Sequence, residues 1–140
     1  MAFIVDNSVV CGWVFGNQST AYTEFVAARL LDEQAHAPAL MHLEFANVLR
    51  TACKRGVLDA PGAHEIIEQV VKLPIVIDQE IPGPSAILSL ALRYDLTSYD
   101  AAYLELALRM QLPVATQDAA LMEAARAAGV GLLKSPPSGQ

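Results

Sequence analysis

Short apolar runs that alternate with helical segments constrain the fold of this chain most strongly. Residues 2–5 (AFIV), 75–77 (IVI) and 113–116 (PVAT) have the length and composition of buried strands. Strands that alternate with helices favour parallel pairing, with helices on both faces of the sheet. Helices are expected at about 19–34, 39–55, 61–71, 84–94, 98–110 and 118–128, and a last edge strand at 130–133.

Composition favours one soluble domain. The chain has 140 residues, of which 54% are hydrophobic and 17% charged. We expect a single domain over residues 1–134 and a disordered tail at 135–140. No segment approaches the roughly 20 apolar residues of a membrane helix, and the N-terminal run lacks the basic start of a signal peptide, so a cytoplasmic location is expected. Cys11 and Cys53 are interpreted as buried, reduced thiols, because both lie in apolar surroundings and two cysteines are too few for a disulfide framework.

Four acidic residues stand where one predicted element gives way to the next. Asp6 directly follows the first strand, Asp118 follows the third, and Glu44 and Asp100 lie on helices that could pack nearby. In parallel sheets the functional crevice lies outside the carboxyl ends of the strands. Four converging carboxylates repel one another, and proteins usually offset this repulsion by binding a hard divalent cation such as Mg²⁺ or Mn²⁺. The pattern therefore indicates metal-assisted chemistry, and a phosphodiester is the expected substrate.

Three of these acids also have structural explanations. Asp6 in D-N-S fits a turn in which short side chains bond their own backbone. Asp100 completes a capping box with Thr97, and Asp118 is a good N-cap. Each acid alone is weak support for a site, and their joint placement is the stronger argument.

Glu44 is the most informative of the four. Its helix is nearly all apolar, and Glu44 and Asn47 are three residues apart, so they share a face. An ionised Glu on such a helix is costly unless it is paired or bound to metal. A buried salt bridge and a metal ligand both satisfy this condition, and Asn47 is taken as a supporting polar residue.

Other charged groups bear on function. Asp78 and Glu80 also follow a predicted strand, and geometry alone does not exclude them. The net charge of −6 argues against broad electrostatic capture of nucleic acid. Arg50, Lys54 and Arg55 form a small basic group that we interpret as a solvated helix end.

Together these motifs resemble the PIN domain, in particular the VapC-like toxins of toxin–antitoxin systems. The resemblance covers residues 3–133, in the family's order. The matching pieces are IVDNSV, HLEFANVL, LTSYDAAYLELALRMQLPVAT and TQDAALMEAARAAGV.

The resemblance implies an α/β/α sandwich with a central parallel sheet and a Mg²⁺- or Mn²⁺-dependent ribonuclease site. The family's acidic quartet carries over to Asp6, Glu44, Asp100 and Asp118, which are then the catalytic and metal-binding residues. The resemblance further implies that Ser8 and Thr116 are polar neighbours of the quartet. It also implies an RNA substrate, cleavage that leaves a 5′-phosphate, and a small antitoxin as partner. Asp78 and Glu80 match no site motif. One departure is Asn7, where many relatives carry Thr.

Two further expectations concern partners and alternatives. The surplus of apolar residues predicts a homodimer, because a monomer would expose sizeable patches. A binding module that keeps the fold but has little nuclease activity is the main alternative. A metal-dependent phosphatase ranks lower, because D-N-S-V lacks the second Asp of a DxD motif.

Overall fold

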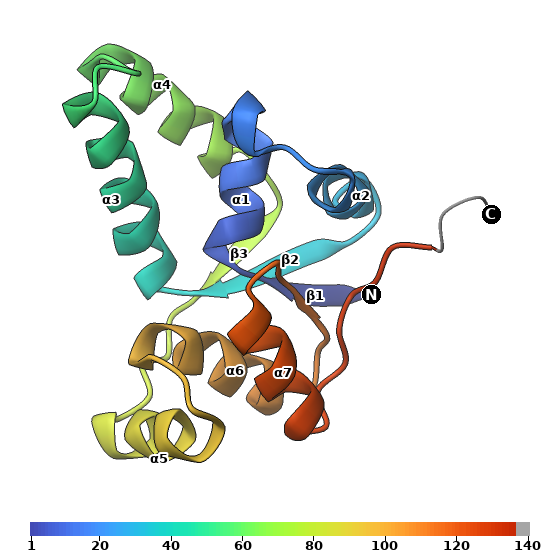
Figure 1. Cartoon of the computed structure of the whole chain (residues 1–140). Helices are drawn as coiled ribbons and strands as arrows, with labels where there is room; N and C mark the ends of the chain where they lie inside the picture. Colours follow the sequence, from blue (N-terminus) through green and yellow to red (C-terminus); the bar gives the residue numbers. More distant parts are fainter. Residues whose placement is uncertain (137–140) are drawn as a thin grey trace.

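A computed structural model of the chain describes residues 1–136. Four short strands form one sheet in the order β3-β2-β1-β4, and every pair is parallel. Figure 1 shows this sheet in the middle of the molecule. The strands are β1 Ala2–Val5, β2 Gln34–Pro38, β3 Ile75–Asp78 and β4 Val114–Ala115.

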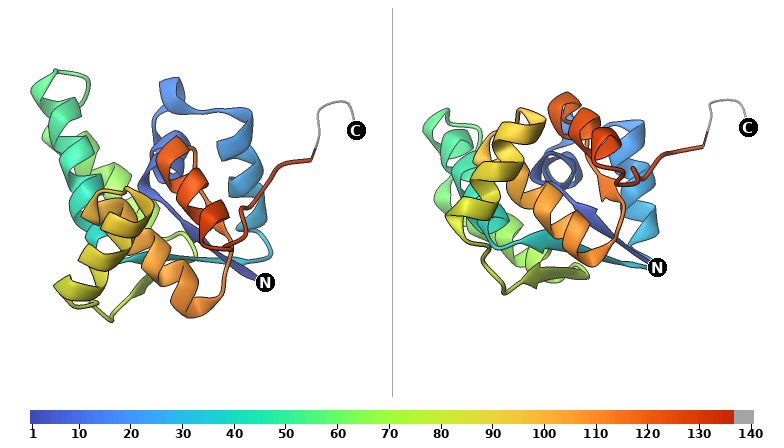
Figure 2. Two further views of the ribbon diagram at one scale, coloured as in Figure 1. Left: turned by 60° about the horizontal axis from the view of Figure 1, so that its bottom comes forward. Right: turned by 90° about the horizontal axis from the view of Figure 1, so that it is seen from below.

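Helices cover both faces of the sheet, as Figures 1 and 2 show. Helices α1 to α4 lie on one face, and α5 to α7 lie on the other. The expected three-layer α/β/α sandwich around a central parallel sheet is therefore confirmed. The helices are α1 Asn7–Val14, α2 Ala21–Arg29, α3 Leu40–Lys54, α4 Ala60–Val71, α5 Pro84–Tyr94, α6 Ser98–Met110 and α7 Ala119–Ala127, with a short 3₁₀ turn at Gly16–Gln18.

The strand order explains why the helices separate in this way. The chain moves outward from β1 through β2 to β3 and then returns across the sheet to β4. Crossovers between parallel strands are right-handed, so reversing the direction of travel puts the later helices on the opposite face. The reversal leaves a crevice between β1 and β4 at the carboxyl ends of the strands, which is where open α/β sheets bind ligands.

Strand β1 is the centre of the core. Phe3, Ile4 and Val5 are fully buried, between neighbouring strands and under helices on both faces. The next residue remains attached to β4, because the Asp6 backbone N–H donates to the Ala115 carbonyl at 3.1 Å. Asp6, the first candidate acid, therefore lies at the carboxyl ends of two neighbouring buried strands, β1 and β4.

The sequence reasoning missed β2, and the helix expected to reach residue 34 ends at Arg29. The segment QAHAP has none of the β-branched or aromatic residues that favour strands. It forms a strand because it pairs with β1 on one side and β3 on the other, with Ala35 and Ala37 fully buried. Tertiary packing therefore overrides local propensity here.

Helix α1 was also missed, because its apolar sequence NSVVCGWV has no clear helical period. Asp6 caps its N-terminus, and Val9 and Val10 are fully buried. Gly12 allows α1 to approach α2 closely: a Cβ at this position would lie 2.9 Å from the Thr23 Cβ. Any larger residue at position 12 would force the two helices apart.

The other helices and strands expected from the sequence lie within a few residues of the observed ones, with one exception near the C-terminus. Residues 130–133 make a single parallel bridge, between Leu132 and Val114, in place of the expected edge strand. The tail expected to be disordered lies mostly outside the described residues, so that expectation stays a prediction. No helix in residues 1–136 has both the length and the apolar character needed to cross a membrane.

Candidate metal centre

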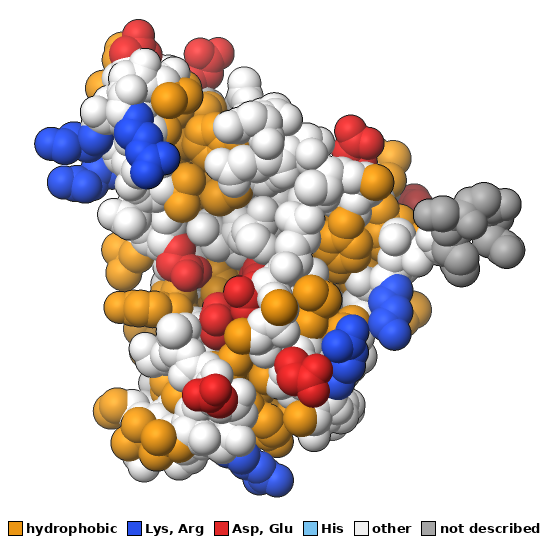
Figure 3. All heavy atoms as spheres, in the orientation of Figure 1, with side chains coloured by type: hydrophobic (Ala, Val, Ile, Leu, Met, Phe, Trp, Pro, Cys, Tyr) orange, Lys and Arg blue, Asp and Glu red, His pale blue; other side chains and the backbone are white. Residues whose placement is uncertain are grey.

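The four candidate acids line one cavity of about 470 Å³ at the carboxyl ends of β1 and β4. We call it the acidic cavity. In Figure 3, acidic side chains gather on this face near the place where α3 approaches α6 and α7. Its lining contains no Lys, Arg or His. The lining residues are Asp6, Asn7, Ser8, Cys11, Gln18, Glu44, Val48, Asp100, Tyr103, Gln117 and Asp118.

Asp6 is the most deeply buried of the four, with 5% of its surface exposed. Ser8 Oγ donates to its Oδ1 at 2.5 Å, and the Thr116 hydroxyl donates to its Oδ2. The Val9 backbone N–H adds a weaker bond to Oδ1 at 3.3 Å. Burial raises the pKa of Asp6, and these hydrogen bonds offset part of the rise. These hydrogen bonds therefore hold the Asp6 carboxylate in one orientation at the carboxyl end of β1.

Asp118 is the N-cap of α7, as its sequence context predicts. Its Oδ2 accepts the Leu121 backbone N–H at 2.8 Å. Its own backbone N–H donates to Thr116 Oγ1 at 3.0 Å. Thr116 is buried and hydrogen-bonds both the Asp6 side chain and the Asp118 backbone, so one hydroxyl couples the two acids.

Asp100 lies in the first turn of α6. Thr97 Oγ1 accepts the Asp100 backbone N–H at 3.1 Å. The capping box expected from the sequence is only half formed, because within residues 1–136 the Asp100 carboxylate accepts no hydrogen bond from the Thr97 backbone N–H. Burial raises the pKa of Asp100, and the charges of Asp118 and Asp6 raise it further. The Asp100 carboxylate is consequently available to a ligand in the cavity.

Glu44 faces the cavity from α3 and is half-buried. The Tyr103 hydroxyl donates to its Oε1 at 2.7 Å. The buried salt bridge left open by the sequence is not formed, because no cation of the described residues pairs with Glu44. Burial raises the pKa of Glu44, the Tyr103 hydrogen bond lowers it, and the charges of Asp100 and Asp6 raise it again.

Tyr103 is the residue that sequence reasoning missed. It is 1% exposed, and its pKa is raised by burial and then by the hydrogen bond to Glu44, so it stays a hydroxyl donor. The sequence feature that could have identified it is its position three residues after Asp100, on the same face of α6.

Cys11 also lines the cavity, and burial together with the charges of Asp6 and Glu44 raises its pKa to about 11.

The supporting residues fall into two groups. Ser8 and Thr116 contact Asp6 directly, as described above. Asn47 is exposed and does not line the cavity, although it shares a helix with Glu44. Asn7 does line it, and its Oδ1 is buried without a hydrogen-bond partner in residues 1–136. A buried polar atom of this kind indicates a missing partner such as water or an ion.

The acids Asp78 and Glu80 lie outside the acidic cavity. Both pair with Arg109 of α6, at 2.6 Å and 3.3 Å, and Glu105 pairs with the same guanidinium at 2.9 Å. These acids therefore belong to an ion-pair network that joins β3 to α6.

The donor set of the acidic cavity fits a hard divalent cation in type and charge, because it offers four carboxylates and none of them forms an ion pair in residues 1–136. The side chains are not closed around an ion. In the described part of the chain, no three His, Cys, Asp or Glu side chains are grouped closely enough to hold one. The carboxylates of Asp6 and Glu44 are instead held by hydroxyl groups.

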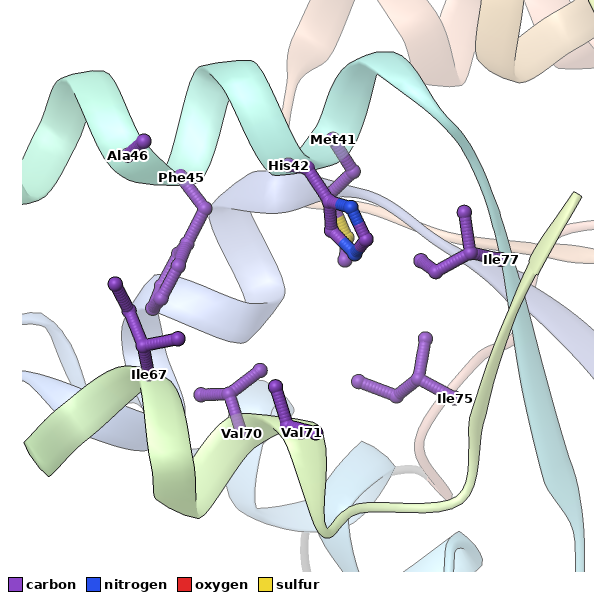
Figure 4. Close-up of a pocket in the computed structure, with 9 residues that line it drawn as sticks. All are labelled: Met41, His42, Phe45, Ala46, Ile67, Val70, Val71, Ile75 and Ile77. Carbon is purple, nitrogen blue, oxygen red and sulfur yellow. The ribbon is translucent and has the colours of Figure 1, made fainter. Parts of the chain in front are cut away.

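A second cavity, of about 360 Å³, lies between α3, α4 and β3. Figure 4 shows its side chains pointing inward from these three elements. We call it the apolar cavity, because His42 is its only polar lining residue. Its other lining residues are Met41, Phe45, Ala46, Ile67, Val70, Val71, Ile75 and Ile77. Among its described lining residues, His42 alone has a side chain suited to metal or acid–base chemistry, and the carboxylates of the acidic cavity do not line it.

Comparison with known proteins supports the fold. No family model and no curated protein matches the chain. Among solved structures, PAE2754 from Pyrobaculum aerophilum is similar, with a TM-score of 0.69, 21% identity, and coverage of 89% of this chain and 84% of that one. FitAcB from Neisseria gonorrhoeae is similar with a TM-score of 0.62, 14% identity, and coverage of 96% and 97%. The chain shares the fold of these two structures, in agreement with the PIN-like fold that its motifs predict.

Proposed function

We propose that the protein is a Mg²⁺- or Mn²⁺-dependent endoribonuclease of the cytoplasm and the toxin of a toxin–antitoxin pair. One observation carries the proposal: four carboxylates from four different elements line one cavity that no basic side chain lines. The PIN-like fold and the family resemblance of the motifs support the same reading.

Asp6 and Asp118 are the proposed direct ligands, and Glu44 and Asp100 bind directly or through water. When bound, a divalent ion lowers the pKa of water and neutralises charge on a reacting phosphate. The chain's own contribution is orientation: Ser8 and Thr116 hold Asp6, and Tyr103 holds Glu44. The raised pKa of Glu44 or Asp100 suits a group that accepts a proton from the attacking water.

The direct test is RNA cleavage by purified protein. We expect cleavage with Mg²⁺ or Mn²⁺, and none in EDTA. Calorimetric titration should detect metal binding that is lost in Glu44→Gln and Asp100→Asn. Asp95→Asn is a matched control, because Asp95 is exposed and adopts a left-handed backbone conformation that Asn also tolerates. Full cleavage in chelator would refute the mechanism.

We further propose that the protein forms a homodimer through its exposed apolar surface. Leu88 and Leu92 are one turn apart on α5 and are 58% and 75% exposed, and α5 has no buried residue. Apolar side chains at this spacing favour a contact with another chain. Light scattering should show a dimer that dissociates in Leu88→Ser/Leu92→Ser. A wild-type monomer at all concentrations would refute the dimer.

The antitoxin is the second proposed partner. An acidic cavity beside apolar walls can be blocked by a helix that offers an Arg to the carboxylates. Expression of the protein alone should slow bacterial growth, and co-expression with a neighbouring small reading frame should restore it. Unimpeded growth at high levels of soluble protein would count against the toxin assignment.

One observation favours the alternative, a PIN-fold binding module with little nuclease activity. The described residues contain no group of three metal-ligating side chains, and hydroxyl groups already occupy Asp6 and Glu44. Under this alternative, calorimetry shows no metal binding, and Asp6→Asn leaves partner binding unchanged. Metal titration of the wild-type protein therefore separates the two functions.

A further inference from the structure

A stripe of polar side chains runs along α3 away from the acidic cavity. Glu44, Asn47, Thr51 and Arg55 follow one another at intervals of three, four and four residues, so they lie on one face of the helix. We call this set the polar stripe. The other face of α3 packs into the core through Met41, Phe45 and Leu49, all buried.

The polar stripe ends at Arg55, and Arg50 and Lys54 lie beside it on the neighbouring face of the helix, about 100° away. We call these three cations the basic end. All three are exposed, and none forms an ion pair in residues 1–136. By contrast, Arg29 and Arg109 pair with nearby acids. In Figure 3, Lys and Arg side chains cover the end of α3 on the same face of the molecule as the acidic side chains of the cavity.

The spacing between the two ends suits a nucleic-acid strand. Glu44 and Arg55 are eleven residues apart in the sequence, which corresponds to about 16 Å along a helix axis. Between them Asn47 offers an exposed side-chain amide, and Thr51 offers a hydroxyl whose proton is donated to the Asn47 carbonyl at 3.1 Å. Amide and hydroxyl groups bond sugars and phosphates without reading sequence.

We propose that single-stranded RNA leaves the acidic cavity along the polar stripe and that its phosphates contact the basic end. This inference rests on the proposed ribonuclease function. Proteins that bind single strands without strong sequence preference use a cationic track of this kind. RNA is favoured over an acidic protein because the stripe starts at the proposed cleavage site. In a chain of net charge −6, the basic end brings together three cations that form no ion pair in residues 1–136.

The test compares two triple variants with the same net charge. Arg50→Gln/Lys54→Gln/Arg55→Gln removes the basic end, and Lys72→Gln/Arg93→Gln/Lys134→Gln removes three exposed cations elsewhere. Binding of a labelled 12-nucleotide RNA is measured by fluorescence anisotropy across a salt series. We expect the slope of log Kd against log salt to fall by about 2 in the first variant only, since each single-strand phosphate contact contributes about 0.7. Cleavage of a dinucleotide, which is too short to reach the basic end, should be unchanged.

A charge-preserving variant, Arg50→Lys/Arg55→Lys, checks that charge is the cause and should bind RNA like the wild type. Equal RNA affinity and salt slope in the two Gln variants would overturn the proposal. So would normal RNA binding by the basic-end variant combined with loss of antitoxin binding, which would assign the surface to a protein. If the wild type cleaves no RNA, the proposed function fails, but RNA binding lost only in the basic-end variant would still support the track.

Discussion

The two cavities beside α3 differ in every property that bears on function. The acidic cavity contains Glu44 and Val48 of this helix and three more carboxylates from other elements. The apolar cavity contains Met41 and Phe45 of the same helix and only one polar residue (Figure 4). One cavity concentrates charge that burial makes unfavourable, and the other leaves apolar surface incompletely packed. We therefore expect substitutions in the first to change activity and substitutions in the second to change stability.

The largest expected effect is the loss of RNA cleavage in Asp6→Asn or Asp118→Asn. Either change removes one charge from the acidic cavity, and with it a proposed metal ligand. We expect activity to fall by about 10³-fold or more, while the metal-free protein remains folded and becomes equally or slightly more stable. Cleavage assays and thermal unfolding measure the two effects. If both variants keep full activity in preparations free of contaminating nuclease, the site assignment is wrong.

Much of this comparison was predictable from the sequence, because it depends on local patterns. Asp6 and Asp118 follow strands, and the sequence alone identified both as candidates. Tyr103 was not identified, because its position beside Asp100 on α6 does not reveal that its hydroxyl reaches Glu44 of α3, a helix from the other face of the sheet. Strand β2 was missed for a similar reason: QAHAP pairs because β1 and β3 flank it, not because its residues prefer strands.

A second, smaller effect is expected for Tyr103→Phe. The change removes the hydroxyl that donates to Glu44 at 2.7 Å and leaves the aromatic ring in the core. A hydrogen bond to a charged group contributes about 1.5–3 kcal/mol, so activity should fall by about tenfold or more through kcat. Tyr99→Phe is the matched control, since Tyr99 lies on the same helix and is 62% exposed. If the two variants lose activity equally, or if Tyr103→Phe loses none, then Tyr103 does not position Glu44 for catalysis.

The apolar cavity should respond in the opposite way. Val70 is half-buried on α4 and lines this cavity. Val70→Ala should lower the free energy of unfolding by about 1–2 kcal/mol, because it enlarges a space that is already incompletely filled. The activity per folded molecule should not change. Denaturant unfolding and cleavage assays on the same preparation test this, and a loss of cleavage without a loss of stability would contradict the separation of the two cavities.

The smallest expected effect is the pH dependence of stability in the metal-free protein. The pKa values of Asp6, Glu44 and Asp100 are all raised, chiefly by burial. A carboxyl with a raised folded-state pKa binds its proton more tightly in the folded state. Its stabilising contribution is therefore complete below the ordinary carboxyl pKa near 4 and is lost as pH rises through the raised value.

Asp100→Asn tests this contribution, because the Asp100 carboxylate caps no backbone group within residues 1–136 and Asn can keep a polar contact with the Thr97 hydroxyl. The melting temperature of the wild type, measured relative to that of the variant, should fall as the pH rises from about 4 to 7. We expect a change below about 4 °C, since about 1 kcal/mol produces a shift of that size in a domain of this length. Mg²⁺ at pH 7 should reverse the difference, because only the wild type keeps all four carboxylates. A difference that is independent of both pH and metal would mean that Asp100 is not electrostatically coupled to the acidic cavity.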